Sequence, residues 1–461
     1  MTGVVFFMKH LTPEIISEIT GGILMGDPAE RDAIVVGAVR DNRHVTPGNL
    51  FVCIQGANVD GHSFANSAFE AGAACCLAEH EIPDPHGPYV LVPSTHEAVM
   101  KLAGYFRRLF DIPVIGVTGS VGKTTTKEMV AAVLGSRHNV LKTQKNMNNE
   151  LGVALTLLSL DESHNSAVVE MGISDFGEMR RLAEMVRPDA CVVTKIGYSH
   201  IETLGDLNGV LRAKSELFEY MSPDSTAIMN GDDDLLYDFS PGINRVLYGL
   251  GMGNDVRAEN IYADGTLSVR FDVVSSKGRF TASVPSYGGQ LVSAALAAAA
   301  AGRLLGLSDD EIAHGLLSYS AVDGRANVVD TGYITLIDDC YNANPDSVAL
   351  ALDSLGSLPV RRRVAILGDM LELGGFSEPM HREIGLVAAR NGVDCLLCSG
   401  ENAAFIYEGY LSGGGAFAMH YPDKSALAEA AALYIREGDA VLVKASHAMK
   451  FEELLPALLG A

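Results

Sequence analysis

The chain has 461 residues, 48% of them hydrophobic, and a net charge of −23. This length exceeds one ordinary domain and predicts two or three, each with a sizeable core. The negative charge excludes a large nucleic-acid-binding surface, because such binding depends on neutralising phosphates. Any anionic ligand must therefore be held by local Lys, Arg or metal against the field of the whole chain.

The seven cysteines are scattered, which is typical of reduced thiols in a cytosolic protein rather than of a disulfide framework. Cys395 and Cys398 lie three positions apart in a short apolar run, which favours core packing over zinc or redox chemistry. The N-terminal residues lack the layout of a signal peptide. The most apolar stretch, Leu291 to Ala301, is too short for a membrane span of about 20 residues. We therefore expect a cytoplasmic protein without membrane insertion.

The first region, residues 1–93, predicts a small α/β domain. The expected elements are a helix from Pro13 to Thr20, strands at 33–37 and 50–54, and a helix at 64–73. Two polar turns interrupt them, Asp41-Asn42-Arg43 and Asp60-Gly61-His62. Such turns are more often solvated loops than ligand sites.

The second region, residues 94–321, contains the strongest motif. An apolar run at 114–118 predicts a buried strand, and the run Gly119-Ser120-Val121-Gly122-Lys123-Thr124-Thr125 leads from it into a predicted helix. A strand, a glycine turn and a helix N-terminus form a phosphate site, because backbone N–H groups and the helix dipole face the anion. Lys123 would reach the terminal phosphates, and Thr124 would ligate Mg²⁺. Val117 replaces the first glycine of the strict pattern, but the context favours a phosphate loop over an ordinary turn.

Two later strands also end in polar residues. Glu170 closes an apolar run, and an acid there, downstream of a phosphate loop, is the usual second anchor for Mg²⁺. His200 follows the strand at 190–196, on the edge where open α/β sheets place ligands. Lys214, taken alone, is a solvated lysine of the next helix. The alternation of strands and helices predicts an α/β fold with a doubly wound, mostly parallel sheet.

The third region, residues 322–461, predicts a smaller Rossmann-like α/β unit. Its expected strands are 333–337, 363–367, 395–397 and 440–443, with helices at 347–355, 380–390 and 424–437. Polar clusters follow three strands, at Asp338 to Pro345, Gly368 to Gly374 and Lys444 to His447. Clusters on one edge predict a binding rim. A dinucleotide site is not expected, because no G-x-G-x-x-G follows a strand here.

The order of these motifs resembles that of the Mur ligases, enzymes that extend peptidoglycan precursors. The resemblance covers essentially the whole chain, as three domains. The motifs that carry it are Thr118–Thr124, Asn146–Gly152, Glu170–Gly172, His200, Lys214, Tyr341–Pro345 and Gly368–Gly374. The last two strings favour the branch that adds D-Ala-D-Ala to UDP-N-acetylmuramoyl-tripeptide.

The resemblance implies a reaction and roles for several residues. ATP would phosphorylate the terminal carboxylate of the UDP-linked tripeptide, and the amine of D-Ala-D-Ala would attack the acyl phosphate. Lys123, Asn149 and Arg325 would contact phosphates. The metal ligands implied for two Mg²⁺ ions are Thr124, Glu170 and His200, with a carbamylated Lys214 in support. The implied substrate contacts are Asp41, Asn42, Arg43, Asp60 and His62 for the UDP moiety, and Asn342, Asn344 and Asp369 for D-Ala-D-Ala.

The resemblance also implies a monomer with hinges near Pro93 and Ala321. Departures from the family pattern lie at its periphery: Gln290 to Ala294 replaces the adenine-contacting His-Asn-x-x-Asn, and Lys444-Ala445-Ser446-His447 replaces Lys-Gly-Ser-Arg. Two alternatives stay open. A sibling amide ligase would lack the Tyr-Asn-Ala-Asn-Pro string, and a P-loop nucleotide switch would need neither a third domain nor a second metal ligand. The identity of the tripeptide's third residue, lysine or a diaminopimelate, has no readable motif.

Overall fold

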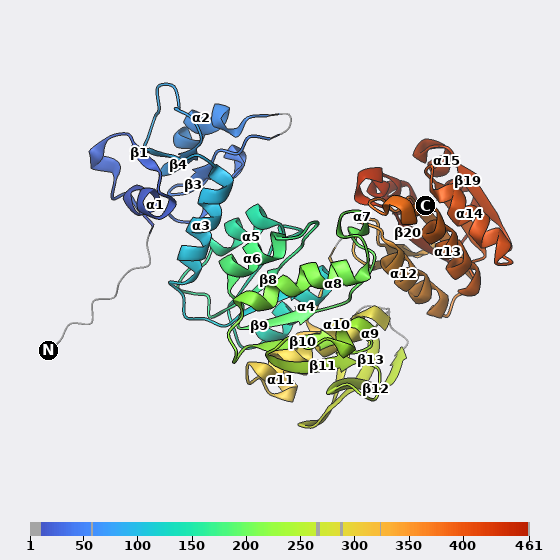
Figure 1. Ribbon diagram of the computed structural model, residues 1–461. Helices are drawn as coiled ribbons and strands as arrows, with labels where there is room; N and C mark the ends of the chain where they lie inside the picture. The colour runs from blue at the N-terminus through green and yellow to red at the C-terminus, as the bar shows by residue number, and fades with distance from the viewer. Residues whose placement is uncertain (1–10, 57–58, 264–267, 286–288, 323, 460–461) are drawn as a thin grey trace.

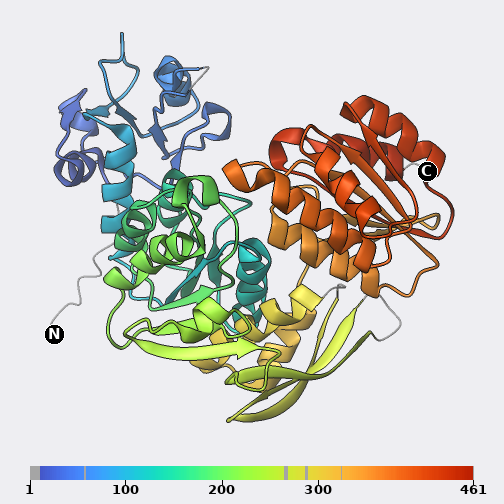
Figure 2. The ribbon, with the colours of Figure 1, turned by 45° about the vertical axis from the view of Figure 1, so that its right-hand side comes forward.

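The computed structural model describes residues 11–56, 59–263, 268–285, 289–322 and 324–459. Three β-sheets with their helices follow one another along the chain and form three units (Figure 1; Figure 2). The central unit lies between the other two in both views. The predicted α/β class is confirmed.

The N-terminal unit has a five-stranded sheet in the order β1-β5-β4-β3-β2. Its elements are α1 (Pro13–Thr20), β1 (Ile23–Met25), β2 (Ala38–Val39), β3 (Leu50–Val52), α2 (Ala65–Glu70), β4 (Cys75–Ala78) and β5 (Tyr89–Leu91). The strand expected at 33–37 is wrong, because Val35 makes only an isolated bridge to Leu11. The amide of Asn49 donates to the Val36 carbonyl in place of a strand partner.

The central unit has a nine-stranded sheet in the order β14-β13-β12-β11-β10-β9-β6-β8-β7. The strands are β6 (Val114–Thr118), β7 (Val140–Lys142), β8 (Ser166–Glu170), β9 (Ala190–Val193), β10 (Thr226–Asn230), β11 (Asn244–Gly249), β12 (Val256–Ala263), β13 (Val269–Ser275) and β14 (Gly278–Val284). The strands from β7 to β12 pair in parallel, as predicted, whereas β13 and β14 extend the sheet in antiparallel fashion. This extension was not predicted. Its one-sided burial pattern differs from the continuous apolar runs of the parallel strands.

Helices cover both faces of the central sheet. They are α3 (Thr95–Arg107), α4 (Lys123–Gly135), α5 (Glu150–Leu157), α6 (Glu178–Val186), α7 (Ile201–Leu204), α8 (Leu207–Ser215), α9 (Asp234–Asp238), α10 (Gly289–Leu304) and α11 (Asp309–Leu317). Along β6, Val114 packs in the core with α3, α5 and α6, and Ile115 packs in the other core with α4, α10 and α11. The sheet is therefore doubly wound, and its central strand is buried on both sides. The apolar run 291–301 is the packed Ala-rich helix that was predicted.

The C-terminal unit has a six-stranded sheet in the order β15-β16-β20-β17-β18-β19, parallel except for β15. Its strands are β15 (Asn327–Asp330), β16 (Thr335–Asp338), β17 (Arg362–Gly368), β18 (Cys395–Ser399), β19 (Ala418–Tyr421) and β20 (Asp439–Lys444). Its helices are α12 (Pro345–Ser357), α13 (Ser377–Arg390), α14 (Ala403–Ser412), α15 (Lys424–Tyr434) and α16 (Leu455–Leu459). Cys395 and Cys398 lie in β18 as free, buried thiols, which confirms that they serve core packing. In the described part of the chain, no helix has the length and apolar character needed to cross a membrane.

Candidate active site

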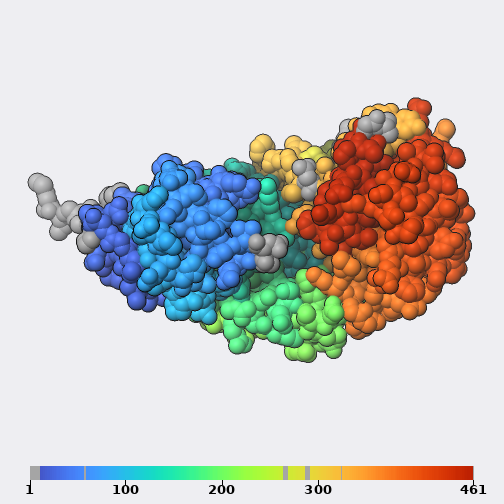
Figure 3. All heavy atoms as spheres, turned by 90° about the horizontal axis from the view of Figure 1, so that it is seen from above, coloured from blue at the N-terminus to red at the C-terminus, as the bar shows by residue number. Residues whose placement is uncertain are grey.

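A cavity of 440 Å³ lies between the central and C-terminal units. The predicted residues that line it are Ser120, Val121, Gly122, Lys123, Thr124, Thr125, Asn149, Glu170, His200, Arg325, Asn342 and Asn344. We call the side formed by 120–125, Asn148, Glu170 and His200 the central wall. The side formed by Arg325, Asp339, 341–344 and Lys444 is the C-terminal wall. Seen from above, the N-terminal and C-terminal units stand on either side of the central unit (Figure 3).

The glycine loop of the central wall is tightly folded. Gly119 has φ 141°, and a Cβ there would lie 2.0 Å from the hydroxyl oxygen of Thr194. Gly122 has φ 83° at the N-terminus of α4, where no side chain caps the helix. The ammonium of Lys123 donates to the Gly119 carbonyl at 2.8 Å, and burial lowers the pKa of Lys123. The loop thus presents backbone N–H groups and a lysine at one helix end, as a phosphate site requires.

Glu170 ends β8 with a carboxylate that is only partly satisfied. Its Oε1 accepts from the Thr124 hydroxyl at 3.1 Å and from the Asn148 amide at 2.7 Å. Its Oε2 is buried and has no hydrogen-bond partner among the described residues. The nearest cation is Lys127, whose ammonium lies 3.7 Å away and donates to the Thr143 carbonyl instead. An oriented carboxylate oxygen without a donor, beside a hydroxyl, suits a hard cation such as Mg²⁺.

Asn148 and Asn149 both line the cavity but make different contacts. Asn149 caps α5, because its Oδ1 accepts from the N–H of Gly152 at 2.9 Å. Asn148, which was not predicted, is the residue that contacts Glu170. The sequence signal was present, since an Asn three residues before a Gly at the start of an apolar run is a helix N-cap pattern.

Lys214 is buried in α8, with 3% of its surface exposed. Burial and the nearby charge of Lys123 hold the pKa of Lys214 well below its ordinary value. The reading of this residue as a solvated helix lysine is therefore wrong. Val210 and Ala213 are buried on the same helix face, so the apolar spacing already indicated an inward position. Lys214 lies behind the cavity rather than on its surface.

His200 adopts a left-handed backbone conformation, with φ 57°. Its Nδ1 lies 2.7 Å from a carboxylate oxygen of Glu372, which belongs to the C-terminal unit and has φ 63°. Burial lowers the pKa of His200, and Glu372 partly opposes this effect. Two non-glycine residues in a sparsely populated conformation that contact each other between the central and C-terminal units indicate a functional constraint.

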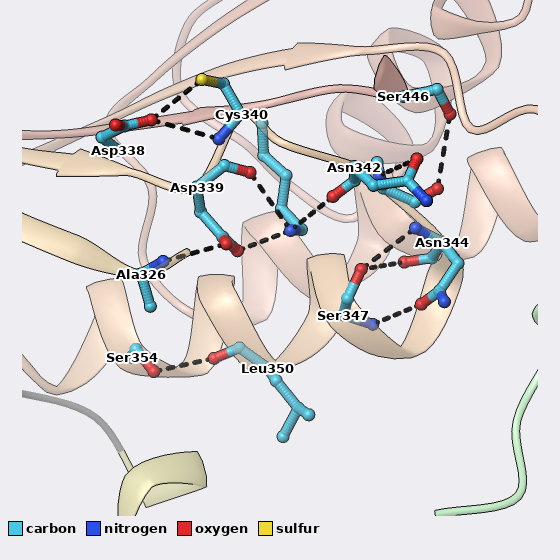
Figure 4. A network of polar contacts seen from close by, with 12 residues as sticks. Ala326, Asp338, Asp339, Cys340, Asn342, Asn344, Ser347, Leu350, Ser354 and Ser446 are labelled. Carbon is cyan, nitrogen blue, oxygen red and sulfur yellow. Dashed lines mark hydrogen bonds and ion pairs between the residues drawn. The ribbon is translucent and has the colours of Figure 1, made fainter. Parts of the chain in front are cut away.

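The C-terminal wall is held by internal hydrogen bonds (Figure 4). The ammonium of Lys444 donates to Asp339 Oδ2 at 2.5 Å and to the Asn342 carbonyl at 2.9 Å. Asn344 caps α12 by accepting the N–H of Ser347 at 2.8 Å. Most polar atoms of this wall are therefore occupied within the C-terminal unit.

Arg325 and Asp369 differ in their access to the cavity. The guanidinium carbon of Arg325 lies 4.0 Å from the ring centre of Tyr341, which also stacks on His447. Asp369 is buried and accepts the N–H of Ala403, the first residue of α14, at 2.7 Å. It lies outside the cavity lining. Of the two, the structure places only Arg325 where it can reach a bound ligand.

The predicted residues of the N-terminal unit lie away from this cavity. Asp41 and Arg43 form an exposed ion pair at 2.6 Å, and the Asn42 amide donates to Ser67 at 3.1 Å. Asp60 lies 2.6 Å from His62 Nδ1, and the other ring nitrogen of His62 accepts the N–H of Glu79. Both motifs therefore form ordered turns on the N-terminal unit.

A second cavity, of 620 Å³, adjoins the glycine loop and shares Val121, Gly122 and Thr125 with the first. Its apolar lining consists of Tyr248, Leu250, Ile261, Tyr262, Val269, Ala294 and Leu350. Ser293 and Ala294 line this cavity and belong to the segment 290–294, which differs from the family pattern. The side chain of Gln290 lies outside the described part of the structure. An apolar cavity beside a phosphate loop has the size and position for a nucleotide base.

Three family descriptions match this chain in succession. Residues 39–107 match the Mur ligase family catalytic domain, residues 117–302 the Mur ligase middle domain, and residues 324–447 the Mur ligase glutamate ligase domain. The chain belongs to the Mur ligase family. The resemblance inferred from the motifs is confirmed.

Relatives within the family match over nearly their whole length. The UDP-N-acetylmuramoyl-tripeptide–D-alanyl-D-alanine ligase of Bacillus subtilis (strain 168) is 35% identical, covering 98% of this chain and 99% of the relative. The Escherichia coli (strain K12) enzyme of the same name is 34% identical over the same shares. Among solved structures, MurF from Acinetobacter baumannii has a TM-score of 0.88 and 27% identity, covering 98% of this chain and all of that one. MurF ligase from Thermotoga maritima in complex with ADP has a TM-score of 0.81 and 28% identity, covering 92% and 97%.

Proposed function

We propose that the chain is an ATP-dependent ligase that joins D-Ala-D-Ala to UDP-N-acetylmuramoyl-tripeptide, a step of peptidoglycan precursor synthesis. The observation that carries the proposal is sequence identity. About a third of all residues, along the whole chain, are identical to those of ligases named for this reaction. The cavity between a glycine loop and a polar C-terminal wall supports it, because both substrates and the phosphates have to meet there.

The reaction forms one amide bond and breaks one phosphoanhydride bond. A carboxylate oxygen of the tripeptide attacks the γ-phosphorus of ATP, and ADP leaves with the electron pair. The D-Ala-D-Ala nitrogen then attacks the acyl carbon, phosphate leaves, and the amine loses a proton. Neither step requires a nucleophilic side chain, so positioning and charge neutralisation supply most of the catalysis. Lys123, the N–H groups of the glycine loop and Arg325 perform that neutralisation.

We infer that Mg²⁺ is held at the carboxylate of Glu170. The buried Glu170 oxygen without a donor and the Thr124 hydroxyl beside the same carboxylate are hard ligands of the kind that fits this ion. Glu170 and His200 are the residues for a second ion. Bound there, Mg²⁺ supplies positive charge to the transferring phosphoryl group.

We infer that Lys214 reacts with CO₂ to become a carbamate. The reaction needs a neutral amine, and burial, which lowers the pKa of Lys214, favours that form. The nitrogen of the neutral amine bonds to the carbon of CO₂ and one proton is released, so a neutral side chain becomes an anion. An anion behind the central wall would oppose the charges of Lys123 and the metal ions.

The remaining ligands fit the surrounding surfaces. The 620 Å³ cavity would hold the adenine of ATP, with Asn230 and Asp232 as polar contacts in place of the family's His-Asn-x-x-Asn. The ordered turns at 41–43 and 60–62 would hold the UDP moiety, and Asn342 and Asn344 would face D-Ala-D-Ala. We place Asp369 in support of the wall, not in contact with the dipeptide.

The three units correspond to domains with the proposed boundaries 1–93, 94–321 and 322–461. Ligand sites on three domains have to meet for chemistry, so hinges are expected near Pro93 and Ala321. Small-angle scattering should report a more compact particle with all ligands bound. We further propose a monomer that acts in the cytoplasm, where ATP and UDP-linked precursors are available.

The experiment is a phosphate-release assay with ATP, Mg²⁺, UDP-N-acetylmuramoyl-tripeptide and D-Ala-D-Ala, omitting one component at a time and weighing the product. Release that needs every component, with a product that gains the dipeptide, is the expected result. Release without D-Ala-D-Ala, or addition of another amine, would contradict the assignment of the C-terminal unit. Comparing the rates with tripeptide substrates that end in lysine and in diaminopimelate identifies the third residue of the preferred tripeptide.

A further inference from the structure

The segment 195–200 connects β9 to α7 and carries His200, and its backbone is held from two different units. The N–H of Ile196 donates to Asp233 at 2.9 Å, and the N–H of Gly197 donates to the Ser120 hydroxyl at 2.9 Å. Both acceptors belong to the central unit. The next N–H, that of Tyr198, donates to Asp346 Oδ2 at 3.0 Å, and Asp346 lies in the first turn of α12 in the C-terminal unit.

Asp346 makes a second contact with the same segment. Its Oδ1 lies 2.8 Å from the ammonium of Lys195, and its side chain is 13% exposed. The approach is so close that a Cβ on Gly197 would lie 2.2 Å from Asp346 Oδ2. One carboxylate thus binds both ends of the turn that precedes His200.

The turn is also bonded to the phosphate loop. The Ser120 hydroxyl donates to the Gly197 carbonyl at 3.0 Å, and the Ser199 hydroxyl donates to the Ser120 carbonyl at 3.1 Å. The amide of Asn344 donates to the Ser199 hydroxyl at 2.5 Å. A continuous chain of hydrogen bonds therefore leads from the start of α12 to the glycine loop.

We propose that Asp346 is a positioning residue that makes the arrangement of His200 and the phosphate loop depend on docking of the C-terminal unit. The amides of Ile196 and Gly197 keep their acceptors whether or not this unit is docked. The Tyr198 amide and the Lys195 ammonium, both partly buried, lose their protein acceptor when it moves away, so two of the contacts that fix the segment are lost. The chemical meaning of this coupling rests on the ligase function proposed above.

The test compares Asp346→Ala and Asp346→Asn with the wild type in the full chain. We expect kcat to fall about 30-fold in Asp346→Ala, with the KM for ATP changed by no more than about twofold, because the loop still forms but is misplaced. Asp346→Asn keeps an acceptor for the Tyr198 amide and loses the charge, so a smaller fall, of about threefold, is expected. Hydrogen exchange in a peptide spanning 195–200 should be faster in the Ala variant.

Asp423→Ala is the matched control, since Asp423 caps α15 within the C-terminal unit by accepting the N–H of Ala426 at 2.9 Å. It should lower the melting temperature without changing kcat or exchange at 195–200. A folded Asp346→Ala protein with wild-type kcat and exchange would overturn the proposal, as would a loss confined to the KM for ATP. If the wild-type protein is inactive toward the proposed substrates, the proposed function is refuted. The positioning role of Asp346 is then tested only by comparing hydrogen exchange at 195–200 in the wild type and in Asp346→Ala.

Discussion

The two walls of the cavity differ in how far their polar groups are satisfied by hydrogen bonds within the protein. On and behind the central wall, Glu170 has a buried oxygen without a donor, and Lys214 is buried with its pKa held down. On the C-terminal wall, Lys444 is bonded to Asp339 and Asn342, and Asn344 caps a helix. Unsatisfied buried polar groups are unfavourable, so they persist where a ligand or modification satisfies them. The central wall is therefore the chemical side, and the C-terminal wall is a rigid frame with few free contacts.

The largest effect should follow from removing the lysine of the glycine loop. Lys123→Ala deletes the one side-chain cation of the loop, and we expect kcat to fall about 1,000-fold or more, because phosphoryl transfer depends on charge neutralisation. Phosphate release measures it, and circular dichroism should show an unchanged fold. Lys277→Ala, an exposed lysine of the turn between β13 and β14, is the control. Undiminished turnover in Lys123→Ala would refute the phosphate site.

Lys214→Ala should be the next most damaging change, with a loss of about 100-fold. If the residue acts as a carbamate, short carboxylic acids should restore part of the activity by entering the space left behind. Lys123→Ala should gain nothing from the same acids, because it lacks a cation rather than an anion. Full activity of Lys214→Ala, or equal response of both variants to the acids, would contradict the carbamate.

Two adjacent asparagines allow a test within a single turn of chain. Asn148→Ala removes a donor from Glu170, and we expect kcat to fall about tenfold with a higher Mg²⁺ requirement. Asn149→Ala removes the cap of α5, which should lower the free energy of unfolding by about 1 kcal/mol. Thermal unfolding and Mg²⁺ titrations separate the two effects. A reversed pattern would restore the expectation that Asn149 contacts the phosphates.

The contrast between the walls also explains what the sequence could predict. The central wall comes mainly from contiguous strings at strand ends, so the glycine loop, Glu170 and His200 could be placed by local rules. The doubly wound sheet followed from the alternation of apolar runs. The burial of Lys214 was not predicted, because the charge of its side chain was given more weight than the spacing of apolar residues along its helix.

The C-terminal wall was harder to predict because its residues, from Arg325 to Lys444, are separated by more than a hundred positions. Whether Asp369 faces a ligand or caps α14 depends on where Ala403 lies, which no local pattern specifies. The β13–β14 extension was missed for the opposite reason. Its half-exposed strands resemble any amphipathic hairpin and carry no signal of the sheet that they join.

The last predicted effect concerns the stability of the C-terminal unit below neutral pH. His381 is fully buried; its Nδ1 donates to the Ser377 carbonyl at 2.7 Å, and its Nε2 accepts the N–H of Met370 at 2.9 Å. Burial lowers the pKa of His381 in the folded protein. Its contribution to stability is therefore complete above the unfolded pKa of about 6.5 and declines as pH falls below that value, because the unfolded chain then binds the proton more readily.

His381→Gln keeps a donor and an acceptor without a titrating proton, so it isolates this dependence. Between pH 6.5 and the lower folded pKa, the wild type should lose up to about 1.4 kcal/mol of unfolding free energy per pH unit more than the variant. Urea unfolding at a series of pH values measures the difference. Parallel curves for the two proteins would mean that His381 accepts its proton in the folded state, and that the loop at Met370 is less rigid than a frame requires. A steeper wild-type curve would support a loop at Met370 that is held by satisfied, neutral contacts of His381.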